Sequence, residues 1–321
     1  MGKDARITEL LEKFEKGNVA AAARLISVLE TGGDDAEAVM DSIFPRTTGA
    51  YRVGFTGPPG AGKSSLVYLL SKLYRGRGRS IGIIAVDPTS PFSGGALLGD
   101  RIRMQRLSED PEVFVRSLAS RGSLGGISNC TDEVADLLVA FGKELIMIET
   151  VGVGQSELEV AEKTHTVVVI LVPESGDGIQ AMKAGLMEIG DIFVMNKADH
   201  PDAELAAQEI EYTLKFKDLA EGEWRPPVIM TSALEETGIA ELAAKIDEHY
   251  QYLEEKDRFE EIRKRTLRSR VRNAFIDKIE SKLWESSSVR SLLEERMNEV
   301  YSGRLSPYRL IRELESYITV K

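Results

Sequence analysis

The residues best suited to chemistry are a glycine-rich run that could bind a phosphate group. Residues 57–65 fit the pattern G-x-x-x-x-G-K-[ST], with a strand-length apolar run before them and leucines at helical spacing after them. Such glycines let backbone N–H groups and the positive end of the following helix point at an anion, because no Cβ is in the way. We expect Lys63 to bridge the β- and γ-phosphates of a nucleotide and the Ser64 hydroxyl to bind Mg²⁺. The nucleotide-binding residues expected here are Gly57, Pro58, Pro59, Gly60, Ala61, Gly62, Lys63, Ser64 and Ser65.

A second motif, N-K-x-D at residues 196–199, indicates that the base is guanine. The Asp199 carboxylate can accept hydrogen bonds from N1–H and the exocyclic amino group of guanine, and adenine lacks this donor pair. We expect Asn196 to connect this loop to the glycine-rich run, and the aliphatic part of Lys197 to cover one face of the base. After the next apolar run, residues 232–234 fit an S-A-x loop whose backbone N–H meets the guanine O6. The expected guanine-binding residues are Asn196, Lys197, Asp199, Ser232, Ala233 and Leu234.

The Mg²⁺ side of the site is expected from acidic residues that follow other apolar runs. Glu149 begins the stretch Glu-Thr-Val-Gly after the run 145–148, and its carboxylate would hold a Mg²⁺-bound water while the N–H of Gly152 senses the γ-phosphate. Because Mg²⁺ takes six oxygen ligands, further carboxylates on a facing loop are expected, and Asp87 and Asp100 are the candidates. For both, the alternative is an ordinary acid on a surface loop.

These motifs must be positioned by the segments between them. Apolar runs of strand length alternate with helical patterns from residue 51 onward, which is typical of an α/β fold with a mainly parallel sheet covered by helices on both faces. Right-handed crossovers bring the carboxyl ends of such strands to one edge, and each motif follows such an end, so we predict a P-loop NTPase fold. The predicted strands are 51–56, 81–86, 113–118, 145–148, 167–172, 192–195 and 228–230, and the predicted helices are 131–142, 179–188, 201–217 and 238–254.

Both ends of the chain are predicted to be helical, which divides it into three parts. Residues 1–45 form an N-terminal extension, residues 46–255 the nucleotide-binding domain, and residues 256–321 a C-terminal helical region. In the last region a long helix over 257–285 carries apolar residues at every fourth position. This apolar stripe needs a partner, either the main domain or a second copy of the chain. Its residues are Leu267, Val271, Phe275, Ile279 and Leu283.

Composition limits the classes of partner and compartment. The formal net charge of -11 disfavours nucleic-acid binding, because a protein that neutralises phosphates needs an excess of Lys and Arg, and it disfavours a polybasic membrane anchor. The single cysteine, Cys130, excludes an internal disulfide, and the 3 widely spaced histidines give no metal cluster. There is no signal-peptide core and no run of about 18 apolar residues, so a cytoplasmic protein without a membrane span is expected.

Together, the motifs resemble those of the MeaB/ArgK family of P-loop GTPases. The most diagnostic blocks are Val-Asp-Pro-Thr-Ser-Pro at residues 86–91, Gly-Asp-Arg-Ile-Arg-Met at 99–104 and Glu-Thr-Val-Gly-Val-Gly-Gln-Ser-Glu at 149–157. The likeness extends over residues 5–320. It implies a chaperone that binds and hydrolyses GTP to GDP, gates adenosylcobalamin loading, and protects or reactivates an acyl-CoA mutase, above all methylmalonyl-CoA mutase.

The resemblance also implies roles for individual residues. Residues 174–183 match a third switch segment that contacts the mutase and helps to form the hydrolytic site, although residues 174 and 175 depart from the family pattern. The C-terminal helices resemble the family's dimerisation arm, which implies a homodimer. The implied Mg²⁺ ligands are Ser64, Asp87, Asp100 and Glu149. The implied catalytic residues are Lys63, Glu149 and Lys183.

Other interpretations of the sequence stay open. One is a GTP-dependent kinase linked to lysine, arginine and ornithine transport, although spacing places no residue as the base that a kinase needs. Another is a GTPase that inserts nickel, although such proteins carry Cys and His ligands that are scarce here. A third is a nucleotide-bound scaffold that does not turn over. No water-positioning residue is assigned, since Gln155 lies beyond Gly152 rather than next to it, so we expect slow intrinsic hydrolysis that a partner accelerates.

Overall fold

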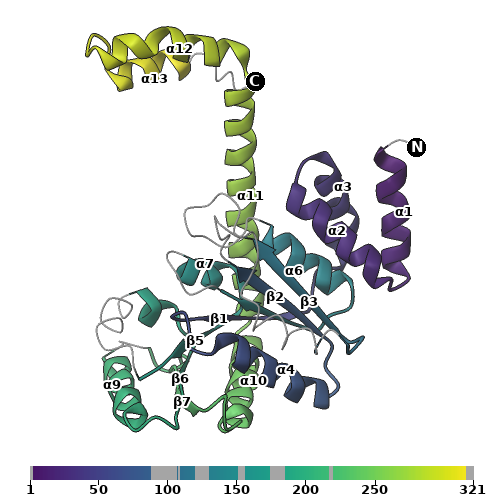
Figure 1. Cartoon of the computed structure of the whole chain (residues 1–321), viewed down its shortest axis with the longest axis vertical. Helices are drawn as coiled ribbons and strands as arrows, with labels where there is room; N and C mark the ends of the chain where they lie inside the picture. Colours follow the sequence, from purple (N-terminus) through teal and green to yellow (C-terminus); the bar gives the residue numbers. More distant parts are fainter. Residues whose placement is uncertain are drawn as a thin grey trace. The chain divides into compact units, whose positions relative to one another are not determined.

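A parallel sheet forms the centre of the computed structural model, which describes residues 3–87, 107, 109–119, 130–150, 156–173, 185–216 and 220–315. Its seven strands lie in the order β3-β2-β4-β1-β5-β6-β7, and each of their pairings is parallel (Figure 1). The strands are β1 (Tyr51–Thr56), β2 (Ile81–Asp87), β3 (Val113–Ala119), β4 (Leu145–Glu149), β5 (Thr166–Leu171), β6 (Ile192–Asn196) and β7 (Val228–Thr231). The order of the strands in the sheet differs from their order along the chain, and β1 lies between β4 and β5.

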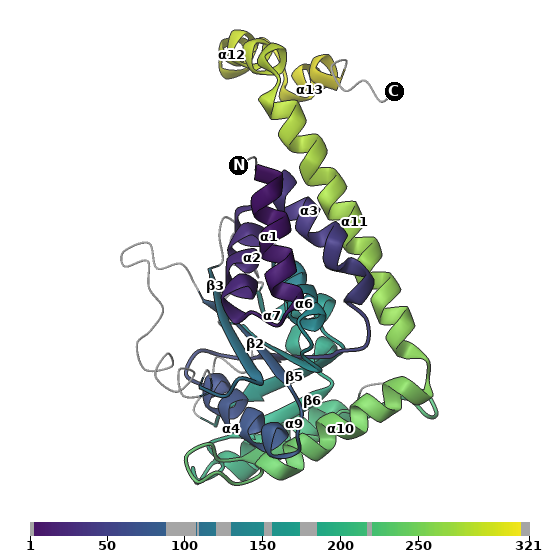
Figure 2. The same ribbon diagram turned by 90° about the vertical axis from the view of Figure 1, so that its right-hand side faces the viewer.

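Helices cover both faces of this sheet. Every residue of β4, β5 and β6 is buried, as expected for parallel strands between two helical layers. One face carries α4 (Lys63–Gly76) and α10 (Ile239–Glu255), and the other carries α6 (Thr131–Ala140), α7 (Ser156–Lys163) and α9 (Ala203–Lys215) (Figures 1 and 2). The predicted α/β fold of the P-loop type is therefore confirmed.

The N-terminal segment adds three helices to the same core. They are α1 (Lys3–Glu15), α2 (Val19–Thr31) and α3 (Asp34–Ile43), followed by the short 3-10 turn η1 (Phe44–Arg46). Their apolar faces pack beside α6; the ring centroids of Phe14 and Phe141, for example, are 5.2 Å apart (Figure 2). Asn18 begins α2 as an N-cap, since its side-chain oxygen accepts a hydrogen bond from the N–H of Ala21 at 2.9 Å. This packing makes the three helices part of the same core as the sheet.

The chain divides into two compact units, Met1–Phe259 and Glu260–Lys321. The long helix α11 (Arg258–Glu285) begins in the first unit, and α12 (Ser287–Tyr301) and α13 (Pro307–Glu315) complete the second. Val289 of α12 and Leu310 of α13 are buried, and Arg296 and Glu313 join the two helices by an ion pair at 3.4 Å. Within the described part of the second unit no residue of α11 is buried; Val271 and Phe275 are 70% and 64% exposed. The three-part division proposed from the sequence stays a prediction.

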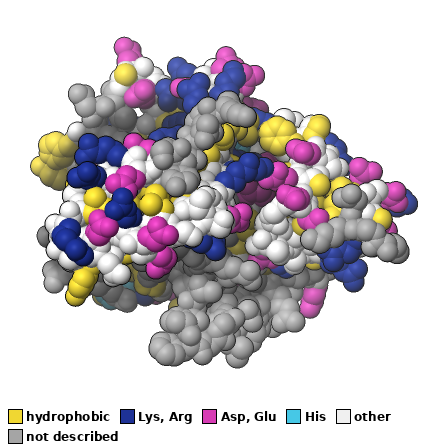
Figure 3. Space-filling model, turned by 90° about the horizontal axis from the view of Figure 1, so that it is seen from above, with side chains coloured by type: hydrophobic (Ala, Val, Ile, Leu, Met, Phe, Trp, Pro, Cys, Tyr) yellow, Lys and Arg dark blue, Asp and Glu magenta, His cyan; other side chains and the backbone are white. Residues whose placement is uncertain are grey.

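The surface carries charges of both signs. Figure 3 shows Lys and Arg side chains interspersed with Asp and Glu side chains on the face seen from above, without a broad all-basic area among the coloured residues. In the part of the chain with assigned positions, no helix combines the length and the apolar character needed to span a bilayer.

A buried polar network lies at the amino-terminal ends of β1 and β5. The Tyr51 hydroxyl is hydrogen-bonded to the Thr166 hydroxyl, which lies 2.7 Å from Nδ1 of His249. The Trp224 ring packs on His249 with a centroid distance of 4.7 Å. Burial lowers the pKa of His249 to about 4, even though a carboxylate oxygen of Asp191 lies 3.6 Å from Nε2. The imidazole is therefore neutral at physiological pH.

This buried imidazole should make stability depend on pH. Between pH 6.5 and about 4 the unfolded chain binds a proton at His249 that the folded chain does not, so the free energy of unfolding falls as the pH falls. The shift corresponds to a loss of about 3 kcal/mol. Urea unfolding at pH 7 and pH 5 measures the part of this loss that falls between these two pH values, about 2 kcal/mol, and the loss should be smaller in His249→Gln by that amount. An equal loss in His249→Gln and the wild type would refute the assignment, and His200→Gln, on the loop after β6, is the matched control.

Candidate nucleotide site

The glycine-rich loop connects the carboxyl end of β1 to α4, and two of its glycines are required by close contacts. A Cβ on Gly57, where φ is 134°, would lie 2.0 Å from the carbonyl oxygen of Ile170. A Cβ on Gly62, where φ is 90°, would lie 2.3 Å from the side-chain nitrogen of Asn196. Gly62 is also the N-cap residue of α4. Because glycine has no side chain, it does not cap the N–H groups of the first turn. The N–H groups and dipole of this helix are arranged as in an anion site.

Lys63, the first residue of α4, lies folded across this loop. It is only 6% exposed, and its Nζ donates hydrogen bonds to the carbonyl oxygens of Gly57 and Pro58, both at 2.9 Å. Its ammonium group is therefore held at the loop, close to where the loop would meet a phosphate. A buried charge of this kind is stabilised by hydrogen bonds to backbone oxygens.

Two of the expected Mg²⁺ ligands lie side by side. The hydroxyl of Ser64 donates a hydrogen bond to the Glu149 carboxylate at 2.5 Å, and Glu149, at the end of β4, is 8% exposed. The neighbouring strand positions this acid, because Phe55 of β1 is paired with Glu149 and accepts a hydrogen bond from the N–H of Thr150 at 3.0 Å. A hydroxyl and a carboxylate are oxygen ligands of the kind that Mg²⁺ prefers, so this pair fits the ion.

The side chains of the remaining expected ligands and switch residues lie outside the part of the chain that the structure describes. The backbone of Asp87 ends β2 at the same edge of the sheet as Glu149, but its side chain lies outside the described residues. The residues that lie wholly outside them are Asp100, Gly152, Gln155 and Lys183. Within the described ranges, no three His, Cys, Asp or Glu residues gather as a metal site.

One amide connects the phosphate side of the site to the guanine side. The Asn196 side-chain nitrogen donates to the carbonyl oxygen of Ala61 at 2.7 Å, which is the link expected between N-K-x-D and the glycine-rich loop. Its side-chain oxygen accepts hydrogen bonds from the Thr231 hydroxyl at 3.1 Å and the Ala233 N–H at 3.2 Å. Asn196 therefore holds three loops in fixed relative positions. Sequence reasoning missed Thr231, whose signal is its position at the end of β7, directly opposite Asn196.

Asp199 and the S-A-x loop lie together beside this amide. A carboxylate oxygen of Asp199 accepts a hydrogen bond from the Ser232 hydroxyl at 2.6 Å, and this bond lowers the pKa of Asp199, which keeps it an ionised acceptor. Lys197 adopts the left-handed backbone conformation with φ of 61°, which turns the chain sharply between Asn196 and Asp199. The S-A-x loop is closed by hydrogen bonds between the backbones of Ser232 and Thr237 at 3.2 and 3.1 Å.

The comparisons with known proteins agree with this arrangement. The family model described as Methylmalonyl Co-A mutase-associated GTPase MeaB matches residues 22–288. A protein of Pyrococcus abyssi whose name describes it as a GTPase is 46% identical over 94% of both chains. A Caenorhabditis elegans protein named methylmalonic aciduria type A homolog, mitochondrial, is 31% identical over 95% of this chain and 81% of its own.

A solved structure shares the architecture over nearly the whole chain. The crystal structure of LAO/AO transport system kinase has a TM-score of 0.74 and 26% sequence identity, and the match covers 99% of each chain. The family match extends well beyond half of the sequence and includes the glycine-rich loop, Glu149 and the N-K-x-D motif. The chain therefore belongs to the MeaB family and is a GTPase.

Proposed function

We propose that this GTPase is a chaperone of an adenosylcobalamin-dependent acyl-CoA mutase, with methylmalonyl-CoA mutase as the first candidate. The observation that carries the proposal is the family match over residues 22–288, since the family is described as mutase-associated. The name of the C. elegans relative refers to methylmalonic aciduria and supports the same partner. GTP binding and hydrolysis would gate cofactor loading and protect or reactivate the mutase.

In this proposal the nucleotide lies along the carboxyl edge of the sheet. Lys63 and the N–H groups of the glycine-rich loop bind the β- and γ-phosphates, and Asp199 binds guanine. Ser64 and Glu149 would hold Mg²⁺, together with Asp87 and Asp100. The bound ion would supply positive charge beside the phosphates. Lys183 and Gly152 are proposed to complete the hydrolytic site from the switch segments.

The metal assignment predicts a specific defect in Glu149→Gln. Glutamine still accepts the hydrogen bond from Ser64 but carries no charge, so the Mg²⁺ concentration for half-maximal GTP hydrolysis should rise by about tenfold or more. A Mg²⁺ titration of phosphate release measures this. Glu241→Gln, an exposed residue in the first turn of α10, is the matched control and should leave the titration unchanged. A Glu149→Gln enzyme with a lower rate but the wild-type Mg²⁺ requirement would contradict the role.

The partner is tested by retention on the candidate mutase. Immobilised methylmalonyl-CoA mutase should retain the full chain to different extents in GDP and in a non-hydrolysable GTP analogue, because the switch segments would report the γ-phosphate. Equal retention in both nucleotides, or none in either, would count against a nucleotide-controlled chaperone. The Glu241→Gln variant is the control and should show the same difference in retention between the two nucleotides as the wild type.

A kinase is the second candidate function, and one observation favours it. The solved structure that resembles this chain over 99% of its length is called a transport system kinase. Kinases need a base beside the acceptor hydroxyl, and none of the described residues of the site is placed as one. Incubation with γ-labelled GTP and a periplasmic amino-acid-binding protein distinguishes the two functions. Label released as inorganic phosphate supports the GTPase chaperone, whereas label transferred to the protein supports the kinase.

We also propose that α11 pairs with a second copy of the chain. Its apolar side chains lie exposed, and burying them is the expected driving force for association. Light scattering should give twice the chain mass of 35.4 kDa, and Phe275→Glu should return it to the monomer value. Asn273→Glu, about 200° around the same helix from Phe275, should not. A wild-type monomer would refute the pairing.

A further inference from the structure

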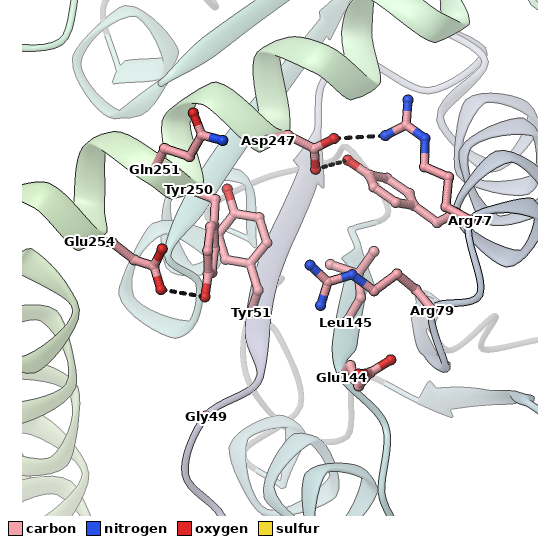
Figure 4. A pocket seen from close by; sticks show the side chains of 11 residues that line it. Gly49, Tyr51, Arg77, Arg79, Glu144, Leu145, Asp247, Tyr250, Gln251 and Glu254 are labelled. Carbon is pink, nitrogen blue, oxygen red and sulfur yellow. Dashed lines mark hydrogen bonds and ion pairs between the residues drawn. The ribbon is translucent and has the colours of Figure 1, made fainter.

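A second pocket lies at the opposite edge of the sheet from the nucleotide site. It has a volume of about 340 Å³ and is lined at its floor by Tyr51 and Leu145, the first residues of β1 and β4 (Figure 4). The glycine-rich loop follows the other end of β1, so the two sites are separated by the length of the strand. The walls come from α10 and from the end of α4 with the segment that follows it. This volume is typical of a site for one small molecule.

Two of the charged residues of this pocket, Asp247 and Arg77, are already paired with each other. Both carboxylate oxygens of Asp247 are occupied, one by the Tyr74 hydroxyl at 3.0 Å and the other by the Arg77 guanidinium at 2.7 Å. Glu254 accepts a hydrogen bond from the Tyr250 hydroxyl at 2.7 Å through one oxygen. Its second oxygen receives no hydrogen bond or ion pair from the described residues. One acceptor therefore remains on the α10 side.

Glu144 offers a similar acceptor at the floor of the pocket. One of its oxygens accepts hydrogen bonds from the N–H and the hydroxyl of Ser80, at 3.0 and 3.3 Å. The other oxygen has no hydrogen-bond donor or cation partner in the part of the chain that the structure describes. The pocket therefore keeps negative charge that an ammonium group could neutralise.

Arg79 supplies the opposite charge. Its guanidinium makes no hydrogen bond and no ion pair with the residues whose positions are described, although it lines the pocket. Figure 4 shows Arg79 and Glu254 on opposite sides of the pocket with the rings of Tyr51 and Tyr250 between them. Burial and the hydrogen bond to the Glu254 carboxylate raise the pKa of Tyr250, which keeps its hydroxyl a donor to Glu254.

We propose that this pocket binds a small zwitterion with one carboxylate and one ammonium group, of the α-amino acid class. The carboxylate pairs with Arg79, whose planar guanidinium can bind it with two hydrogen bonds. The ammonium group pairs with the Glu254 carboxylate, beside the ring of Tyr250. A ligand that is only anionic would face Glu144 and Glu254, and one that is only cationic would face Arg79. A zwitterion satisfies both sides of the pocket.

Three related probes test the two charges separately. Fluorine NMR can follow binding of para-fluoro-L-phenylalanine to the full chain, beside its amide, which lacks the carboxylate, and para-fluorophenylpropanoate, which lacks the ammonium group. Saturating GDP and Mg²⁺ keep the phosphate site from binding the anion. The zwitterion should bind more tightly than either analogue by about tenfold or more, because each loses a charged hydrogen bond.

The variants assign each charge to a side chain. The affinity of Arg79→Gln for the zwitterion should be no higher than the affinity of the wild type for the amide. The affinity of Glu254→Gln for the zwitterion should be no higher than the affinity of the wild type for the propanoate. Glutamine can still accept the hydrogen bond from Tyr250, so Glu254→Gln keeps the local packing. Arg24→Gln, an exposed arginine of α2 outside the pocket, is the matched control and should bind like the wild type.

Several results would overturn the inference. They are equal affinity for the three probes, the propanoate binding as tightly as the zwitterion, full binding by Arg79→Gln, or no binding up to about 10 mM. Because the pocket lies at the amino edge of the sheet, these results do not depend on whether the chain assists a mutase. The mutase-retention experiment tests that proposal separately.

Discussion

Replacing Lys63 by alanine should slow GTP hydrolysis by roughly 10²- to 10³-fold at saturating Mg²⁺. The Lys63 ammonium group is buried at the glycine-rich loop, 2.9 Å from the carbonyl oxygens of Gly57 and Pro58. In the proposed site the Lys63 ammonium group neutralises the charge that develops on the phosphate oxygens as the bond to the γ-phosphate breaks. A buried ammonium group stabilises this charge more strongly than water would, because the dielectric constant around it is low. Phosphate release under saturating GTP measures the loss.

Lys72→Ala is the matched control for this prediction. Lys72 belongs to the same helix, α4, but its side chain is exposed and lies over the Tyr68 ring at 5.6 Å rather than at the loop. Its GTPase rate should equal that of the wild type. Thermal unfolding of both variants shows whether the fold is kept. A folded Lys63→Ala enzyme with a rate within about threefold of the wild type would exclude Lys63 from the hydrolytic site.

Replacing Asp199 by asparagine should change the base that the site accepts. Affinity for GTP should fall by about 100-fold or more, because the amino group of guanine then faces the amide nitrogen of asparagine instead of a carboxylate. Xanthine carries an oxygen where guanine carries that amino group, so the same asparagine should bind XTP more tightly than GTP. The asparagine oxygen can still accept the hydrogen bond from Ser232, which keeps the loop in place. Competition of both triphosphates against a fluorescent nucleotide gives the two affinities.

Asp202→Asn provides the control for the base switch. Asp202 is the N-cap of α9, three residues after Asp199, and makes no side-chain capping hydrogen bond. Its substitution should leave the preference for GTP unchanged. If Asp199→Asn kept the wild-type preference for GTP over XTP, guanine would have to be recognised elsewhere, and the interpretation of the N-K-x-D motif would be wrong.

Much of the fold could be predicted because its signals are local. The apolar run 145–148 became β4 (Leu145–Glu149), and the helical pattern 201–217 became α9 (Ala203–Lys215), differing only at the ends. Strands that are buried on both faces must be apolar throughout, so each one is visible in the sequence without knowledge of its neighbours. The glycine-rich loop is visible for a similar reason, since its backbone conformation restricts which residues can occupy it.

Contacts between distant segments could not be predicted in this way. The link from Asn196 to the glycine-rich loop was expected from its motif, but the hydrogen bonds that Asn196 accepts from Thr231 and Ala233 depend on the sheet order, in which β6 and β7 are neighbours. Thr231 was missed for this reason, because only the pairing of β6 with β7 places it opposite Asn196.

The sequence by itself determined the class of fold, the glycine-rich loop, the guanine motif and the membership of a GTPase family, because each depends on residue types at fixed short spacing. Only the tertiary structure decided that Ser64 lies against Glu149, that Asn196 holds three loops together, and that Arg79 and Glu254 line a pocket at the far edge of the sheet. The physical reason is that strand order and helix packing depend on the total burial of apolar surface over the whole chain, which no short stretch of residues records.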